Sequence, residues 1–183
     1  ADFRAAMDDD LDTPRATALL FDTVRRANAA LDAGDATWRT LVEELDTDHP
    51  AHAMAALNTA DLGHGLVIRV EDGVDAGIVQ LTWRGVPGDG RLLGNARVLV
   101  VLGDGARLDL VESFTGGGAL NLVNQLRLGA GSRLRHARLQ DNAPGSWLIT
   151  RTELEQGADS AFEQASLDLG AGLARHLGTA QAA

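Results

Sequence analysis

The stretch Gly103-Asp104-Gly105-Ala106-Arg107-Leu108 decides the fold, because it recurs twice farther along the chain. Its echoes are Gly129-Ala130-Gly131-Ser132-Arg133-Leu134 and Gly157-Ala158-Asp159-Ser160-Ala161-Phe162, at intervals of 26 and 28 residues. Apolar or alternating runs come before and after each copy. A period of this size is typical of a solenoid, because one coil of such a fold cannot bury its own apolar face. We therefore interpret these glycines as turn residues and not as a phosphate-binding loop, which would need a third glycine and a following helix.

The runs between the turns have the two-residue period of β-strands from about residue 63 onward. Aligning the three turns places Leu108, Leu134 and Phe162 at one level of the fold. Strands are expected at 66–70, 78–83, 97–102, 120–128 and 148–154, and the nearly unbroken apolar run 97–102 predicts a strand buried on both faces. The sequence therefore predicts a mainly β fold, a right-handed parallel β-helix of about three to four coils. Its two ends would be open rows of unpaired backbone groups, which N-terminal helices or a partner would cover.

The sequence pattern of the first third of the chain predicts helices. Asp12-Thr13-Pro14 is a helix start, because a capping oxygen accepts a free backbone N–H and Pro14 has none to leave unpaired. Apolar residues then follow at helical spacing as far as Leu31, and another helical turn is expected at 51–57. We therefore predict two domains, a helical segment over 1–48 and a partial β-helix over 49–183.

Composition restricts the function. The formal net charge is −10, all sixteen basic residues are Arg, and residues 1–48 alone carry twelve acids and five Arg. This balance argues against non-specific nucleic-acid binding, which needs clustered cations. The absence of Cys excludes disulfides and thiolate-held zinc or iron–sulfur clusters within this chain. With no signal peptide and no apolar run of about 18 residues, we expect a cytoplasmic protein without a membrane partner.

Several polar groups suggest chemistry, and each has a structural interpretation that we prefer. The acids of 8–12 suit a hard cation, yet acids also favour a helix start. In the cluster at 46–52, Pro50 separates the two histidines. We place His136 in a coil, level with Leu110 and Gln164, and His176 at the exposed end of the last coil.

Three sets of side chains complete the survey. Asn121, Asn124 and Asn142 suggest an inward asparagine ladder. The basic stretch contains Arg127, Arg133, Arg135 and Arg138, and alternation places Arg133 and Arg135 on the outer face. Glu112, Asp141 and Glu163 share no level in the turn alignment, which argues against a paired-carboxylate carbohydrate enzyme. We therefore predict no catalytic, cofactor-binding or metal-binding residue, and no enzyme activity.

From about residue 51 to 176 the chain resembles the SufB/SufD family, the β-helical scaffolds of the SUF iron–sulfur assembly system, and is closer to SufD. The matching stretches are Met54–Ala60, Gly65–Val70, Arg97–Ala106, Leu134–Gln140 and Gln156–Phe162. The resemblance implies a right-handed β-helix in a complex with a SufB-like paralogue and an ABC-type ATPase. The family's cluster-assembly residues and ATPase-docking helices lie beyond the matched stretches, so the resemblance assigns no functional residue here.

A second resemblance covers residues 2–31. The stretch Phe3–Ala16, continuing through Leu19–Asp22, is similar to the start of the helical domain that follows the catalytic core in cysteinyl-tRNA synthetases. That family's nucleotide-binding signatures and zinc-binding cysteines are absent from this sequence. The leading hypothesis is a non-enzymatic scaffold segment for iron–sulfur cluster assembly. The alternatives are a truncated or fused fragment without independent activity, and a tRNA-synthetase-derived accessory helical module.

Overall fold

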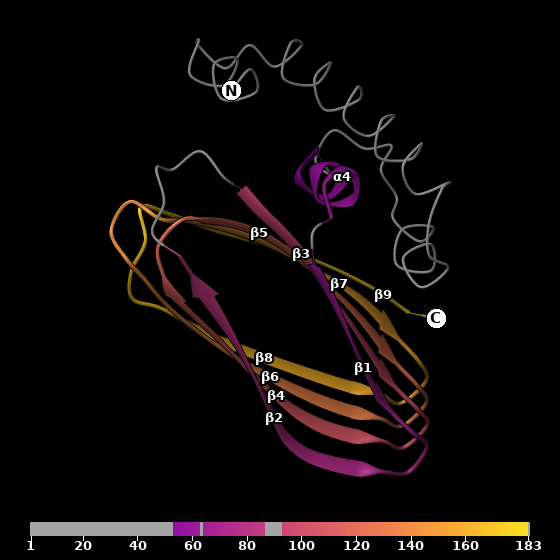
Figure 1. The fold of residues 1–183 in the computed structure, drawn as a ribbon. Coiled ribbons are helices and arrows are strands. Elements are labelled where there is room, and N and C mark those ends of the chain that lie inside the picture. The colour runs from indigo at the N-terminus through magenta and orange to yellow at the C-terminus, as the bar shows by residue number, and fades with distance from the viewer. Residues whose placement is uncertain (1–52, 63, 87–92, 183) are drawn as a thin grey trace.

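The computed structural model describes residues 53–62, 64–86 and 93–182, and the helices expected before residue 53 lie outside this part. The described chain contains one helix followed by nine strands (Figure 1). The helix is α4 (Ala53–Ala60), and the strands are β1 (His64–Val70), β2 (Asp75–Gly85), β3 (Leu93–Leu102), β4 (Arg107–Gly116), β5 (Ala119–Leu128), β6 (Arg133–Asn142), β7 (Trp147–Gln156), β8 (Ala161–Asp168) and β9 (Leu173–Ala182).

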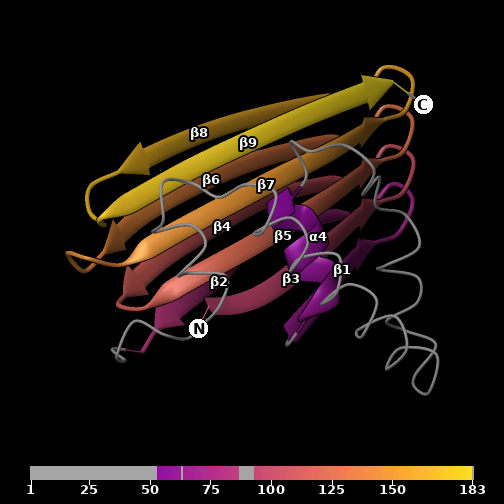
Figure 2. The same ribbon diagram turned by 90° about the horizontal axis from the view of Figure 1, so that it is seen from above.

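The strands form two parallel sheets that face one another across the interior (Figures 1 and 2). The odd sheet has the order β1-β3-β5-β7-β9, and the even sheet has the order β2-β4-β6-β8. Each coil contributes one strand to each sheet, so the described chain makes four coils and a final strand. The predicted mainly β fold, a parallel β-helix of about this size, is confirmed.

The pairing register confirms the alignment made from the turns. Leu108 pairs with Leu134, and Leu134 pairs with Phe162. Equivalent residues therefore stack on one another, with hydrogen bonds running between coils along the whole fold. This stacking allows short strands to form a continuous core, since each coil covers the apolar face of the next.

The repeated glycine motif forms the turns between odd and even strands. Gly105 and Gly131 both have positive φ, at 68° and 66°. Asp159 occupies the same place in the third copy and also has positive φ, at 57°. Glycine adopts this conformation without a Cβ clash, and aspartate tolerates it better than most residues. The turn interpretation of these glycines is confirmed.

Strand β3 is buried on both faces, as its apolar run predicts. Val98 and Val100 point into the core, and Arg97 is fully buried on the opposite side. Helix α4 lies against that outer face and contacts β3 and β5. The helix was expected at 51–57 and runs from Ala53 to Ala60. α4 covers this sheet face, where its Asn58 and Thr59 accept hydrogen bonds from buried Arg97. The expectation that N-terminal helices cover an open end concerns helices that lie outside the described residues.

Two ends remain where strands have a neighbour on one side only among the described residues. β1 and β2 form one end, and β8 and β9 form the other. The inward side chains of β2 are half-buried, whereas β8 is exposed along almost its whole length.

Candidate functional site

A buried carboxylate stands at the centre of the solenoid interior. Glu112 projects inward from β4 and is fully buried. Three side chains donate hydrogen bonds to it: Trp83 Nε1 at 3.0 Å, Asn124 Nδ2 at 3.0 Å and His136 Nε2 at 2.8 Å. These donors come from β2, β5 and β6, so one carboxylate links three coils and both sheets. Such a group is tolerated in a core only when its oxygens are paired.

The ionisation of Glu112 is set by these neighbours. Burial by itself would raise the pKa of the carboxyl. The hydrogen bond from His136 and the attraction to its ring act against burial, and Trp83 and Arg138 add to them. The net result is a pKa of Glu112 below its ordinary value, so the group is a stable buried anion near neutral pH.

Arg138 supplies the opposing charge. Its Nε lies 3.8 Å from Glu112 Oε2, and its guanidinium carbon lies 5.2 Å from the centre of the Phe114 ring. Phe114 in turn stacks on Trp83, with ring centres 6.5 Å apart. Desolvation lowers the pKa of Arg138, while Glu112 and Asp168 act to raise it. The buried cation is therefore held by a carboxylate and an aromatic face together.

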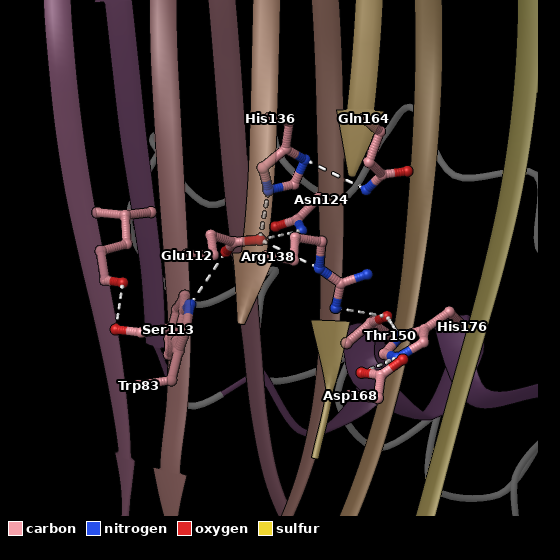
Figure 3. A network of polar contacts seen from close by, with 11 residues as sticks. Trp83, Glu112, Ser113, Asn124, His136, Arg138, Thr150, Gln164, Asp168 and His176 are labelled. Atoms are coloured by element: carbon pink, nitrogen blue, oxygen red, sulfur yellow. Dashed lines mark hydrogen bonds and ion pairs between the residues drawn. The ribbon is translucent and has the colours of Figure 1, made fainter. Parts of the chain in front are cut away.

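The network continues to the β8–β9 end of the fold (Figure 3). Arg138 Nη2 donates to Thr150 Oγ1 at 3.0 Å, and Thr150 Oγ1 lies 2.7 Å from His176 Nδ1. His176 Nε2 lies 3.0 Å from Asp168 Oδ1. The polar chain thus runs from half-buried Trp83 on β2 to side chains that solvent reaches on β8 and β9.

The network holds charge in place and does not conduct protons along its full length. Gln164 Nε2 lies 3.3 Å from His136 Nδ1, so both nitrogens of the buried imidazole face polar groups. An arginine side chain cannot give up its proton, and Arg138 stands between Glu112 and Thr150. These hydrogen bonds and ion pairs instead hold the two sheets, and all four strands of the even sheet, in one register.

A second polar cluster fastens α4 to the outer face of the odd sheet. Arg97 Nη2 donates to Asn58 Oδ1 at 3.0 Å and to Thr59 Oγ1 at 2.8 Å. Asn58 Nδ2 donates to the carbonyls of Ala96 and Asn121, at 2.8 and 2.9 Å. Desolvation lowers the pKa of Arg97 to about 10, although Glu153 acts to raise it. The helix is therefore attached by buried hydrogen bonds as well as by apolar contact.

A groove of about 240 Å³ lies over β5, β7 and β9. Its charged side chains pair with one another, Arg127 with Glu155 at 3.3 Å and Arg151 with Glu153 at 2.6 Å. Paired charges of both signs do not indicate one class of ligand.

The predicted asparagine ladder is wrong. Asn121 points outward, where its Nδ2 donates to the Met54 carbonyl and to Asn95 Oδ1, and Asn124 points inward to Glu112. Asn142 lies at the end of β6, in the other sheet. Neighbouring residues of opposite parity lie on opposite faces of a strand, so the three amides cannot align.

The predicted levels of the histidines and acids are confirmed. His136 lies between Leu110 and Gln164, and His176 is on the exposed last strand. Glu112, Asp141 and Glu163 pair with three different partners and share no level: Arg138, Thr115 and Arg135 respectively.

The basic stretch divides between two faces. Arg133 and Arg135 are exposed, as alternation predicts, and Arg135 pairs with Asp109. Arg138 is buried, and its role was missed. Its odd spacing from Arg133 and Arg135 was the available signal, since it places Arg138 on the inner face with Leu134.

The acids at 8–12 and the cluster at 46–52 lie outside the described residues. Within the described ranges, no group of three or more His, Cys, Asp or Glu side chains gathers as metal ligands would. Those same ranges contain no helix long and apolar enough to cross a membrane.

Comparison with known proteins separates the chain into two parts. Residues 2–60 match the DALR domain. Curated cysteine–tRNA ligases are similar to the chain over a short stretch: that of Clavibacter michiganensis subsp. michiganensis is 65% identical over 34 residues, and that of Kocuria rhizophila is 63% identical over 35. These stretches cover 19% of this chain and 7% of each ligase, so the chain spans only a small part of the curated relatives it matches.

No solved structure matches the chain. The second family match covers residues 87–182, which contain β3 to β9 and nearly the whole polar network. Its model is described as the SufBD core domain of the SUF system for FeS cluster assembly. Because this match extends over just more than half of the chain, the protein belongs to the SufBD core-domain family.

Proposed function

We propose that this chain is a non-enzymatic scaffold segment for iron–sulfur cluster assembly, which acts through protein–protein contacts in a SUF-type complex. One observation carries the proposal: the residues that match the SufBD core domain form a solenoid whose last strands, β8 and β9, each have a hydrogen-bonded neighbour on one side only among the described residues. Unpaired strands offer backbone groups to a partner, and exposed apolar side chains at this end, Leu167, Leu169 and Leu173, add surface that a partner would bury.

The partners in this proposal are a SufB-like paralogue and the SUF ABC-type ATPase, and the compartment is the cytoplasm. We also propose the domain division at residues 48 and 49. The DALR match extends to residue 60, and α4 packs on the solenoid. Helix α4 would therefore connect the helical segment to the solenoid.

The test is co-expression of the tagged chain with a SufB-like paralogue and the ATPase, followed by pull-down and size-exclusion chromatography. Recovery of a complex of defined size is expected. The variant Leu167→Asp should weaken this complex, whereas Ile78→Asp at the opposite end of the solenoid should not. The two variants are matched because both side chains are exposed, so neither change should disturb the core. Isolation of the chain alone would contradict the scaffold role and favour a fused or truncated fragment without independent activity.

A second candidate rests on the DALR match over residues 2–60. The proteins similar to this part are named as cysteine–tRNA ligases, so an accessory helical module that contacts transfer RNA is the alternative. The negative charge of residues 1–48 disfavours it. A gel-shift titration with transfer RNA at two salt concentrations decides the matter, since salt-sensitive binding would support the module and no shift would exclude it.

A further inference from the structure

The outer face of the odd sheet carries an excess of positive charge. Five arginines and two glutamates point outward from its strands, a net of +3 on a chain whose formal net charge is −10. These residues are Arg69, Arg97, Arg127, Arg151, Arg175, Glu153 and Glu155. A face of this kind attracts an acidic occupant.

One part of this face, over β7 and β9, combines apolar and basic side chains. Trp147 is 46% exposed although β7 has hydrogen-bonded neighbours on both sides, so its exposure belongs to the sheet face and not to an end of the fold. Ile149 and Leu177 are half-buried, and Arg175 is exposed with no acid paired to it among the described residues. We call these four residues the β7–β9 patch. Tryptophan and arginine are the residues that most often dominate binding at protein interfaces.

Helix α4 lies on the same face as the β7–β9 patch (Figure 2). At the start of α4, the Met54 carbonyl accepts a hydrogen bond from Asn121 Nδ2 of β5 at 2.7 Å. Asn121 pairs with Ile149 of the patch, and Ile149 pairs with Arg175. Because neighbouring strands lie about 4.8 Å apart, the start of α4 is one to two strand spacings from the patch.

The segment at residues 35–48 is acidic and joins the chain close to α4. It contains five acids and one Arg, a net charge of −4. Its large apolar residues recur at three- and four-residue steps, the spacing of one helix face: Trp38, Leu41, Val42 and Leu45. From residue 48 to residue 53 the extended chain spans at most about 18 Å. The β7–β9 patch is therefore within reach of this segment.

We propose that residues 35–48 dock on the β7–β9 patch, with their apolar face against Trp147 and Ile149 and their acids toward Arg175. The short connection holds the segment at a local concentration of about the millimolar range, so weak contacts are enough to keep it on the patch. The segment extends the cover that α4 gives to the odd sheet and leaves the outer face of the even sheet uncovered. This contact within the chain goes beyond the scaffold role and does not depend on it.

The test uses a paramagnetic label on the full ¹⁵N-labelled chain, which has no Cys, so that one introduced cysteine takes the label at a single position. In the labelled variant Thr40→Cys, the indole N–H resonance of Trp147 should broaden and that of Trp83 should not. In the labelled variant Ala161→Cys, the Trp147 resonance should stay sharp. Ala161 is exposed on the even sheet and lies just after the end of β7, whereas Trp147 is at the start of β7.

A charge reversal tests the attraction between the segment and the patch. In the labelled Thr40→Cys chain, Arg175→Glu should lower the ratio of docked to undocked segment by about two- to fivefold, the range for one exposed ion pair, and so reduce the broadening of Trp147. The matched change Arg133→Glu reverses an exposed charge on the even sheet and should leave the broadening unchanged.

Three results would overturn the proposal. One is a Trp147 resonance that is as sharp with the label at position 40 as with the label at position 161. Another is broadening of Trp83 in place of Trp147, which would put the segment at the β1–β2 end. The third is equal broadening when the label and the ¹⁵N are carried by different copies of the chain, because the occupant would then be a second copy. These readouts do not require the Arg175 variant to fold.

Discussion

The two ends of the solenoid have the same backbone arrangement, but the side chains that face the interior differ in polarity. At the β1–β2 end the inward columns of the even sheet begin with Val79, Leu81 and Trp83. At the β8–β9 end the same columns finish with Gln164, Ser166 and Asp168. The odd sheet shows a similar change along two of its inward columns. One column begins with Leu66 and finishes with Gly178, and the other begins with Ile68 and finishes with Ala180.

This difference explains why the polar network lies where it does. Coils of apolar interior stack by burying area alone, whereas coils of polar interior need each group paired. Glu112 stands where the change occurs: it pairs upward with Leu81 in β2 and downward with Arg138 in β6. The two ends therefore differ in the side chains that face the interior, which are apolar at the β1–β2 end and polar at the β8–β9 end.

Removal of Glu112 tests whether the two ends depend on one buried anion, and it is the largest effect we expect. Glu112→Ala leaves Arg138 without its carboxylate in the interior, and breaking one partner of a buried pair costs about 3–5 kcal/mol in the free energy of unfolding. Urea denaturation measures the change. Glu163→Ala on the outer face should alter that free energy by no more than about 0.5 kcal/mol. A similar small effect at both positions would mean that the network does not hold the coils together.

Paired leucine truncations compare the middle of the solenoid with its apolar end. Leu134→Ala should lower the free energy of unfolding by about 2–5 kcal/mol, because the side chain is fully buried and leaves a cavity. Leu81→Ala on half-buried β2 should cost about 1 kcal/mol, since part of its area already contacts water. Equal losses in thermal or urea unfolding would show that the β1–β2 end is covered in solution.

Hydrogen exchange compares the two ends directly. β9 amides should open with a free energy about 1–2 kcal/mol below that of β1 amides, because local stability follows buried apolar contact. Ile68 and Val70 of β1 supply such contact, and the small inward residues Ala174, Gly178 and Ala180 of β9 supply little. Faster exchange in β1 would reverse the order of the two ends.

Acid titration tests the buried anion Glu112, and its effect is the smallest of those we expect. The pKa of Glu112 is lower in the folded chain than its ordinary value, so its contribution to stability is complete above an ordinary carboxylate pKa of about 4.3. The contribution is lost as the pH falls through the lower, folded-state pKa. Unfolding midpoints measured from pH 7 downward should therefore fall in acid. Glu112→Gln, which cannot titrate, should show a shallower fall than the unaltered chain.

Much of the fold could be predicted from local pattern. The turn motif gave the register between coils, because a repeated turn aligns the strands that follow it, and Leu108, Leu134 and Phe162 do stack. The apolar run 97–102 predicted burial of β3 on both faces. The two exposed arginines of β6 followed from simple alternation.

The network could not be predicted in the same way. Arg138 is 26 residues from Glu112 and 12 residues from Thr150, and the three lie on three strands, so no local spacing relates them. Strand β6 is ambiguous by itself, since Leu134 and Leu139 have opposite parity and only one of them faces inward. The prediction of an asparagine ladder was wrong for a related reason. It rested on residue type, whereas the face on which a side chain lies is decided by its odd or even position in the strand.

The sequence by itself determined the period, the turns and the β-helix, because these depend on backbone conformation and on alternation within one strand. Only the tertiary structure decided which polar groups are inside, that one carboxylate joins three coils, and that Asp168 meets His176 at the open end. The physical reason is that a buried charge is stabilised by partners from other coils, and the stacking of parallel strands alone brings those partners within hydrogen-bond distance.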